Sequence, residues 1–446
     1  MFFKKLDIER LPKDTKKAVA LVLMGNFLEY FDLMLGVHLA MILNKVFLPQ
    51  DTGYEHILRP MTFLLPLLMR PFAAIIWGYI GDNLGRKVVL TATMIIMGAS
   101  CLFLTFVPTY AVWGITSTFT FFTIRSIQAF ASAGELVGAD VYIAETVPAP
   151  RAYATASFVE VTAGLGGLLA CIVGAFTTFV DPINGWRYAF VIGASIAVLG
   201  SLARKDLKET PEFLKKKSIL IDVGKTEFIE NKIEQFRIKN IGCMILMYAI
   251  FGFVFFFVYS YCNSLLEKKF AYSTSHVLMV SASIITLKMV STFTFGRIAL
   301  RVCPRKLLRV IYGYLFIIGL ALSLYPNWHE SSFNIRLLQY IISLAPGGLD
   351  MALPLFMKSY ATNKKMQASL WGWAISKTMI YFVTAVLCAT IGDLNILLVI
   401  LSFVAACSYI GVHLFKTYDQ ILTPKECSFI NSFQKIKIQT NNSDLA

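Results

Sequence analysis

Long apolar runs separated by short polar loops make up most of this sequence. The runs approach the ~20 residues that a helix needs to cross the hydrocarbon core of a bilayer. The pattern predicts an all-α integral membrane protein with about twelve transmembrane helices. The predicted spans lie near residues 18–46, 58–80, 87–106, 111–145, 152–179, 187–203, 241–265, 276–299, 306–325, 334–357, 367–391 and 394–415.

The composition excludes an ordinary soluble enzyme. Of the 446 residues, 57% are hydrophobic and only 15% are charged, whereas a soluble domain carries about a quarter charged residues. The sequence has no HExxH, no GxSxG in a suitable context and no P-loop, and its histidines are dispersed. The eight cysteines stand singly, which predicts small packing residues rather than zinc ligands or disulfides. We expect no enzymatic activity, no metal and no cofactor.

The formal net charge of +14 is distributed in a way that favours a membrane topology over nucleic-acid binding. Cations gather in every second loop between apolar spans, as they do in the cytoplasmic loops of multi-pass membrane proteins. We therefore predict contact with membrane lipid, no nucleic-acid partner, a solvated basic face and both termini in the cytoplasm. The basic loops are Lys16–Lys17, Arg86–Lys87, Arg204–Lys217, Arg301–Arg309 and Lys358–Lys365.

A charged stretch rich in lysine and glutamate divides the spans into two sets of six. The predicted organisation is an N-terminal six-helix bundle at 1–203, a cytoplasmic central linker at 204–240, a second bundle at 241–416 and a cytoplasmic tail at 417–446. The two bundles are expected to be pseudo-repeats. In support, the loop at residues 296–306 has the glycine and cations of the loop after the second span but lacks its acidic residue.

The loop after the second span reads Gly81-Asp82-Asn83-Leu84-Gly85-Arg86-Lys87. Its glycines allow two helix ends to approach closely, and its cations suit a cytoplasmic loop. The pattern G-D-x-x-G-R-K in this setting resembles the signature loop of the major facilitator superfamily, whose members move small solutes by rocking two halves of the protein. The resemblance implies a conformational gate loop formed by Gly81, Asp82, Gly85, Arg86 and Lys87. We expect its charged side chains to latch helix ends.

Polar side chains inside the first six spans are functional candidates, because an unpaired ion at the bilayer centre costs several kcal/mol. Within each span, spacings of three or four residues place them on a shared helical face. Pairing that merely holds the bundle together is the alternative interpretation of each acid. These side chains are Asn26, Glu29 and Asp32 in the first span, Arg70 in the second, and Arg125, Gln128 and Glu135 in the fourth.

Proton coupling needs a carboxyl group whose proton affinity rises on desolvation and falls when a cation approaches. We assign that role to Asp32, Glu29 and Glu135, with Arg70 or Arg125 as the cationic modulator. The substrate cavity is assigned to Asn26, Arg70, Arg125 and Gln128, together with three residues of the second half described below.

Six motifs occur in order: Gly25-Asn26-x-x-Glu29-Tyr30-Phe31-Asp32, Arg70-Pro71, Gln128 with Ala133-Gly134-Glu135, Ala144-Glu145 to Pro148, Gly185-Trp186-Arg187 and Glu209-Thr210-Pro211-Glu212-Phe213. Together they resemble the metabolite:proton symporter family of that superfamily. The resemblance implies a proton-driven importer in a bacterial-type inner membrane. Known members take proline and glycine betaine, α-ketoglutarate, citrate or shikimate. The second half departs from the family pattern, since Ser359–Lys365 stands where F-P-T-R-x-R is usual.

The second half carries its own charges inside predicted spans, at Lys288, Asp350 and Lys377. We assign all three to the substrate cavity. Asp350 could neutralise one lysine, and a second lysine could bind a substrate carboxylate as a point charge. The aromatic residues Tyr259, Tyr261, Trp371 and Trp373 could cradle a quaternary ammonium group if betaine is the substrate. For the aromatic run Phe251–Tyr261, a lipid-facing and packing surface is the favoured interpretation.

The leading functional hypothesis is a secondary active transporter that imports a small osmolyte or organic acid by proton symport and alternating access. One alternative is a facilitator or exchanger of an organic anion such as a dicarboxylate. Another is a sensor derived from a transporter, which binds its ligand without net flux. The expected partners are a small-molecule substrate, protons and lipid, and the sequence leaves the oligomeric state open.

Overall fold

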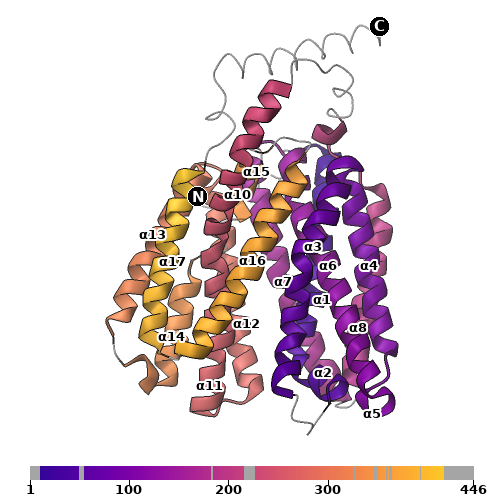
Figure 1. Cartoon of the computed structure of the whole chain (residues 1–446), viewed down its shortest axis with the longest axis vertical. Helices are drawn as coiled ribbons and strands as arrows, with labels where there is room; N and C mark the ends of the chain where they lie inside the picture. The colour runs from indigo at the N-terminus through magenta and orange to yellow at the C-terminus, as the bar shows by residue number, and fades with distance from the viewer. Residues whose placement is uncertain are drawn as a thin grey trace.

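The computed structural model describes residues 11–49, 55–181, 184–214, 227–325, 327–345, 350–357, 360, 364–391 and 393–415. Within these residues all regular structure is helical. Figure 1 shows two groups of long helices standing side by side, the indigo-to-magenta helices of the first half on the right and the pink-to-yellow helices of the second half on the left.

Among the described residues of the first half, each long helix overlaps one span expected from the sequence. These helices are α1 (Lys13–His38), α3 (Glu55–Asn83), α4 (Arg86–Phe106), α6 (Ile115–Thr146), α7 (Arg151–Val180) and α8 (Gly185–Ala203), accompanied by the short α2 (Ala40–Phe47), α5 (Tyr110–Trp113) and η2 (Arg204–Asp206).

The second half begins with a long rod that a π-helical turn interrupts. The rod consists of α10 (Glu227–Phe256), the π-turn η3 (Phe257–Tyr261) and α11 (Cys262–Phe270). The remaining helices are α12 (Thr274–Ile298), α13 (Pro304–Ser323), η4 (Trp328–Glu330), α14 (Ser332–Ser343), η5 (Asp350–Ala352), α15 (Leu353–Met357), α16 (Lys365–Ile391) and α17 (Leu394–Leu414).

Two elements differ from the sequence-based expectation. The rod already begins at Glu227, inside the stretch predicted as a linker, because lysine and glutamate are good helix formers and extend the helix past its apolar part. The tenth predicted span is not one uninterrupted helix, since α14 ends at Ser343. Pro346, Gly347 and Gly348 follow in the sequence, and these residue types have the lowest helix propensity.

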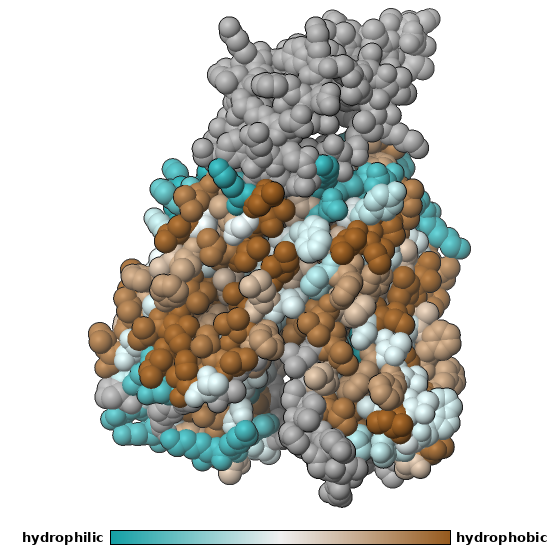
Figure 2. Space-filling view, viewed as in Figure 1, coloured by the Kyte–Doolittle hydropathy of each residue, from teal (hydrophilic) through white to brown (hydrophobic). Residues whose placement is uncertain are grey.

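The flank of the molecule is apolar. Figure 2 shows hydrophobic side chains over the middle of both groups and polar side chains gathered towards the two ends. Large apolar side chains of these helices are exposed, for example Phe103 at 67% and Phe179 at 85%. Eight helices among the described residues are long and apolar enough to cross a membrane by length and composition. Together with the helix order, this confirms the prediction of an all-α membrane protein.

The two groups meet where α3 packs on α16 and α7 packs on α12. Within the first group, α1 packs closely on α7 at Gly166, because an added Cβ there would overlap the carbonyl of Phe27 and lie 3.0 Å from the amide nitrogen of Phe31. A Cβ at Gly296 of α12 would likewise overlap Ser157 of α7. Glycine therefore allows close helix contact both inside a group and between the groups.

Candidate functional site

The loop between α3 and α4 folds around a buried arginine. Gly85 has a φ of +119°, which side chains with a Cβ rarely adopt, so the turn requires glycine. The completely buried Arg86 donates to the carbonyl oxygen of Gly81 at 2.6 Å and to the two carboxylate oxygens of Glu145 at 2.9 and 3.0 Å. Asp82 lies 3.4 Å from the same guanidinium. These bonds tie the end of α3 to the end of α6.

The same loop reaches the second half of the chain at the start of α16. The two oxygens of Asp82 accept hydrogen bonds from the backbone N–H groups at positions 366 and 367, at 3.0 and 2.9 Å. A carboxylate is favourable at a helix N-terminus because unpaired N–H groups point towards it. Lys365 Nζ lies 2.5 Å from Glu212 and 3.3 Å from Glu145. We refer to these contacts as the loop-end latch, formed by Asp82, Glu145, Glu212 and Lys365.

Glu209 completes this end of the molecule. It accepts the backbone N–H groups of Arg86 and Lys87 at 3.0 and 3.1 Å and so caps α4. The ammonium group of Lys87 donates to the carbonyl oxygen of Lys205 at 3.1 Å. The structure thus brings the predicted loop residues together with the segment that follows α8.

Glu135 is paired with an arginine that the sequence analysis placed on a solvated face. Arg204 donates to one Glu135 oxygen at 2.8 Å, bonds the other with its second nitrogen, and donates to the carbonyl oxygen of Leu90 at 2.6 Å. Thr93 donates to Glu135 at 2.7 Å. Arg204 is completely buried, so the expectation of a solvated side chain is wrong there. The physical reason is that a buried carboxylate requires a counter-ion.

Asp32 lies in a second polar cluster inside the first group. One of its oxygens accepts hydrogen bonds from the thiol of Cys101 at 2.8 Å and from the amide of Gln128 at 3.3 Å. Arg125 donates to the amide oxygen of Gln128 at 2.8 Å, and its guanidinium packs against Gly36, where an added Cβ would overlap it. Three predicted residues therefore come together, and Cys101, expected to be a packing residue, joins them as a donor.

Glu29 and Arg70 lie where the first group meets α16. Ser132 donates a hydrogen bond to Glu29, and Arg70 is close enough to Glu29 to interact with it electrostatically. The Arg70 guanidinium lies 4.9 Å from the ring centroid of Trp373 and 5.8 Å from that of Tyr381, which is the range of a cation–π contact. The ammonium of Lys377 lies 5.8 Å from the same tyrosine ring. We define the central site as Glu29, Arg70, Trp373, Lys377 and Tyr381.

Asn26 is not brought to the central site. It is completely buried, and its amide donates to the carbonyl oxygen of Val159 at 2.6 Å and to the hydroxyl of Thr162 at 3.1 Å. Both acceptors lie on α7, so Asn26 connects α1 to α7 within the first group.

Lys288 is paired across the interface between the groups. Its ammonium lies 2.5 Å from the carboxylate of Glu160 on α7, and both charges interact electrostatically with Tyr259. Asp350, the predicted partner for a lysine, begins η5, and its side chain lies outside the described residues. The sequence analysis missed Glu160, although an acid inside the fifth predicted span was a signal that could have identified it.

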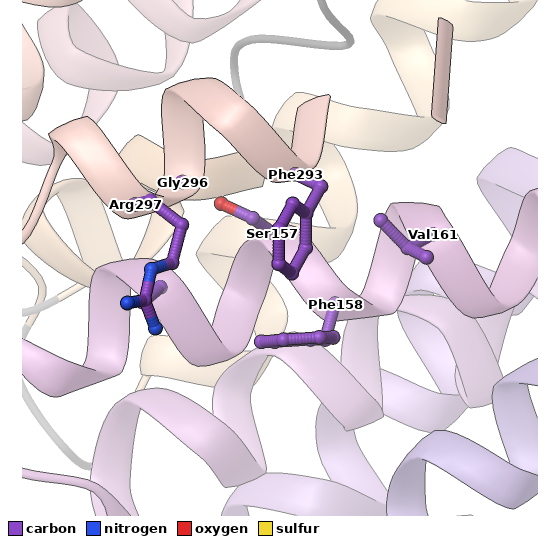
Figure 3. Close-up of a pocket in the computed structure, with 7 residues that line it drawn as sticks. Ser157, Phe158, Val161, Phe293, Gly296 and Arg297 are labelled. Carbon is purple, nitrogen blue, oxygen red and sulfur yellow. The ribbon is translucent and has the colours of Figure 1, made fainter. Parts of the chain in front are cut away.

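A narrow crevice lies farther along the contact between α7 and α12. Figure 3 shows the rings of Phe158 and Phe293 next to each other, with Arg297 to their left; their centroids are 5.7 Å apart and their planes meet at 78°. Its lining is mostly apolar, so the candidate chemistry belongs to the central site. Within the described residues, no group of three His, Cys, Asp or Glu side chains is placed to hold a metal ion. The crevice is lined by Ala154, Ser157, Phe158, Val161, Phe293, Gly296 and Arg297.

Comparison with known proteins agrees with this architecture. A family model described as Major Facilitator Superfamily matches residues 22–338. A Staphylococcus aureus (strain COL) protein provisionally named as a proline/betaine transporter is 26% identical over 422 residues, covering 86% of this chain and 89% of that protein. The proline/betaine transporter of Salmonella typhimurium (strain LT2) is 29% identical over 283 residues, covering 60% of this chain and 56% of that protein.

A solved structure supports the fold independently. The proton:xylose symporter XylE, bound to 6-bromo-6-deoxy-D-glucose, superposes with a TM-score of 0.69 at 17% identity. The superposition covers 91% of this chain and 98% of that chain. At this identity the likeness concerns the fold alone, and it confirms the arrangement of helices predicted from the apolar runs.

Proposed function

The chain belongs to the major facilitator superfamily, and we propose that it is a secondary active transporter that imports a small zwitterionic osmolyte together with protons. Relatives named as proline/betaine transporters support this substrate class. We place the protein in a bacterial-type inner membrane with both termini in the cytoplasm, on the basis of the basic loops. The corresponding domains are residues 1–203 and 241–416, with the linker 204–240 between them and the tail 417–446 after them.

The position of Arg70 carries the proposal. Its guanidinium lies over Trp373 and Tyr381 and interacts with Glu29. A guanidinium binds a carboxylate through two parallel hydrogen bonds, and aromatic faces bind quaternary ammonium groups. A substrate carboxylate that draws Arg70 towards itself frees the two aromatic faces for the cationic nitrogen of the same molecule. The central site therefore suits a ligand that carries both charges.

Proton coupling follows from the competition for Arg70. Glu29 as a carboxylate attracts the guanidinium, whereas protonated Glu29 releases it to the substrate. Asp32 lies one helical turn farther along α1, and its hydrogen-bonding cluster provides a second protonatable carboxyl group. Glu135, paired with Arg204, remains the third candidate. In this scheme, binding a proton and binding the substrate carboxylate favour each other.

Alternating access involves the loop-end latch. Asp82 and Lys365 join the two groups at the end that carries residues 81–87. Breaking these contacts lets the groups separate at that end while they close at the other, as in a rocking cycle. The described conformation corresponds to the state closed at the loop end.

Uptake of labelled proline, glycine betaine and α-ketoglutarate into proteoliposomes, with and without an inward proton gradient, tests the proposal. We expect gradient-stimulated uptake of a zwitterion, loss of stimulation in Glu29→Gln and weaker substrate binding in Arg70→Lys. Asp206→Asn, which breaks the exposed pair of Asp206 with Lys17, is the control and should behave as the unmodified chain. Zwitterion uptake that ignores the gradient would refute proton symport.

The cations Arg70, Lys288 and Lys377 favour a second candidate, a facilitator or exchanger of organic anions. That function predicts α-ketoglutarate uptake that needs an internal counter-substrate but no proton gradient. A sensor without transport activity predicts ligand-induced thermal stabilisation with no uptake of any of the three compounds. The same proteoliposome experiment separates these outcomes.

A further inference from the structure

The pair of Glu160 on α7 and Lys288 on α12 lies between the two groups. The carboxylate and ammonium are 2.5 Å apart, and their side chains are 20% and 32% exposed. Each residue lies well inside its helix, away from both helix ends. A charge exposed to hydrocarbon costs several kcal/mol, so the partial exposure of this pair is favourable only where water or a polar ligand reaches it.

Tyr259 lies within electrostatic range of this pair and in an irregular part of its helix. It lies within the π-helical turn η3, and such turns are rare and occur frequently at functional sites. Its hydroxyl interacts electrostatically with both charges of the pair. Its ring lies 5.3 Å from Phe255, whose ring lies 5.6 Å from Tyr381 of the central site. A row of aromatic rings thus connects the pair to the central site.

We infer that Glu160, Lys288 and Tyr259 form a second binding site for the zwitterionic substrate, and this inference rests on the proposed function. The substrate replaces the ion pair between Glu160 and Lys288 with two new ion pairs. Its carboxylate binds Lys288, and its cationic nitrogen binds Glu160 against the ring of Tyr259. No net charge is left unpaired in the exchange, which keeps its electrostatic cost low in a partly buried site. An anion without a cationic nitrogen would draw Lys288 away from Glu160 without supplying a positive charge in its place, and it is therefore disfavoured.

Glycine betaine and 3,3-dimethylbutyrate provide a matched pair of probes, because they have the same shape and carboxylate but only betaine carries the cationic nitrogen. In proteoliposomes, Glu160→Gln should raise the KM for betaine about tenfold, the usual scale for losing one charged contact. It should leave inhibition by 3,3-dimethylbutyrate unchanged or stronger. Lys288→Met should weaken both ligands. Tyr259→Leu, which removes the aromatic ring, should reduce betaine uptake.

The double variant Glu160→Gln/Lys288→Gln separates recognition from a purely structural role. Its two amides can still form a hydrogen bond between the groups of helices. If the Glu160–Lys288 pair has a purely structural role, the KM for betaine should therefore return to the unmodified value. Recognition predicts instead that betaine and 3,3-dimethylbutyrate become nearly equivalent. Asp206→Asn, which removes an exposed ion pair elsewhere, is the matched control.

The outcomes distinguish this inference from the proposed function. The second site is refuted, while symport stands, if the unmodified protein takes up betaine and Glu160→Gln leaves the KM for betaine unchanged. The same conclusion follows if the double variant restores the KM for betaine to the unmodified value. If the unmodified protein shows neither uptake nor betaine-dependent thermal stabilisation, both proposals fail.

Discussion

Replacing Arg204 with methionine should destabilise the first group of helices strongly. Its guanidinium bonds both oxygens of Glu135 and the carbonyl of Leu90, and both charged side chains are buried. Arg204→Met leaves the Glu135 carboxylate buried without its counter-ion. Removing one partner of a buried ion pair costs about 3–5 kcal/mol. We expect the midpoint of thermal unfolding to fall by on the order of 10 °C.

The double variant Arg204→Met/Glu135→Leu should recover most of that loss. Replacing both members of a buried pair by apolar side chains of similar size is often neutral or stabilising. Thermal unfolding of the detergent-solubilised protein, followed by size-exclusion chromatography, measures all four members of the cycle. A double variant as unstable as Arg204→Met would refute the reasoning, because the cost would then come from packing rather than from the unpaired charge.

The same double variant tests whether Glu135 carries protons. If the stable double variant retains gradient-stimulated uptake, Glu135 serves the structure of the bundle, and proton coupling belongs to the carboxyl groups of Glu29 and Asp32. If it still binds substrate but no longer responds to the gradient, Glu135 belongs to the coupling machinery. Both results are informative only because removal of both charges avoids the folding defect of the single variant.

Three further changes have defined outcomes. Asp82→Ala removes two hydrogen bonds to the start of α16 and should open the loop end, measured as faster labelling of a cysteine introduced there. Gly166→Ala should lower the unfolding midpoint because its Cβ meets backbone, whereas Gly313→Ala, with open space at its Cβ, should not. Cys101→Ser keeps a donor to Asp32 and should retain uptake, whereas Cys101→Val should reduce it about fivefold.

The sequence was sufficient to predict an all-α membrane protein, because the helices follow from local properties. An apolar run long enough to cross a bilayer has few alternatives to a helix. The loop at residues 81–87 was equally informative. Its Gly85 stands at a turn with a φ of +119°, a backbone conformation that other residues rarely adopt. Helix ends were less predictable, because polar residues continue α10 beyond the apolar stretch.

The pairing of charges was not predictable from the sequence. Arg204 stands at the start of a basic stretch and has the same local context as the solvated cations after it, yet it reaches back to Glu135. Glu160 lies 128 positions before Lys288, and no spacing rule relates residues on helices of different groups. The rule that singled out Lys288, an ion inside an apolar span, applies equally to Glu160 and would have identified it.

Under the proposed function, the charges of the two sites favour a zwitterion over a simple anion. At the central site Arg70 lies within electrostatic range of Glu29, and at the second site Lys288 is ion-paired with Glu160. A ligand with a carboxylate alone would draw the cation away from the acid at either site. A ligand with both charges also supplies a cationic nitrogen, which takes the place of that cation beside the acid. Selectivity then arises from the penalty on an unpaired buried acid, and it should weaken for anions whenever either acid is neutralised.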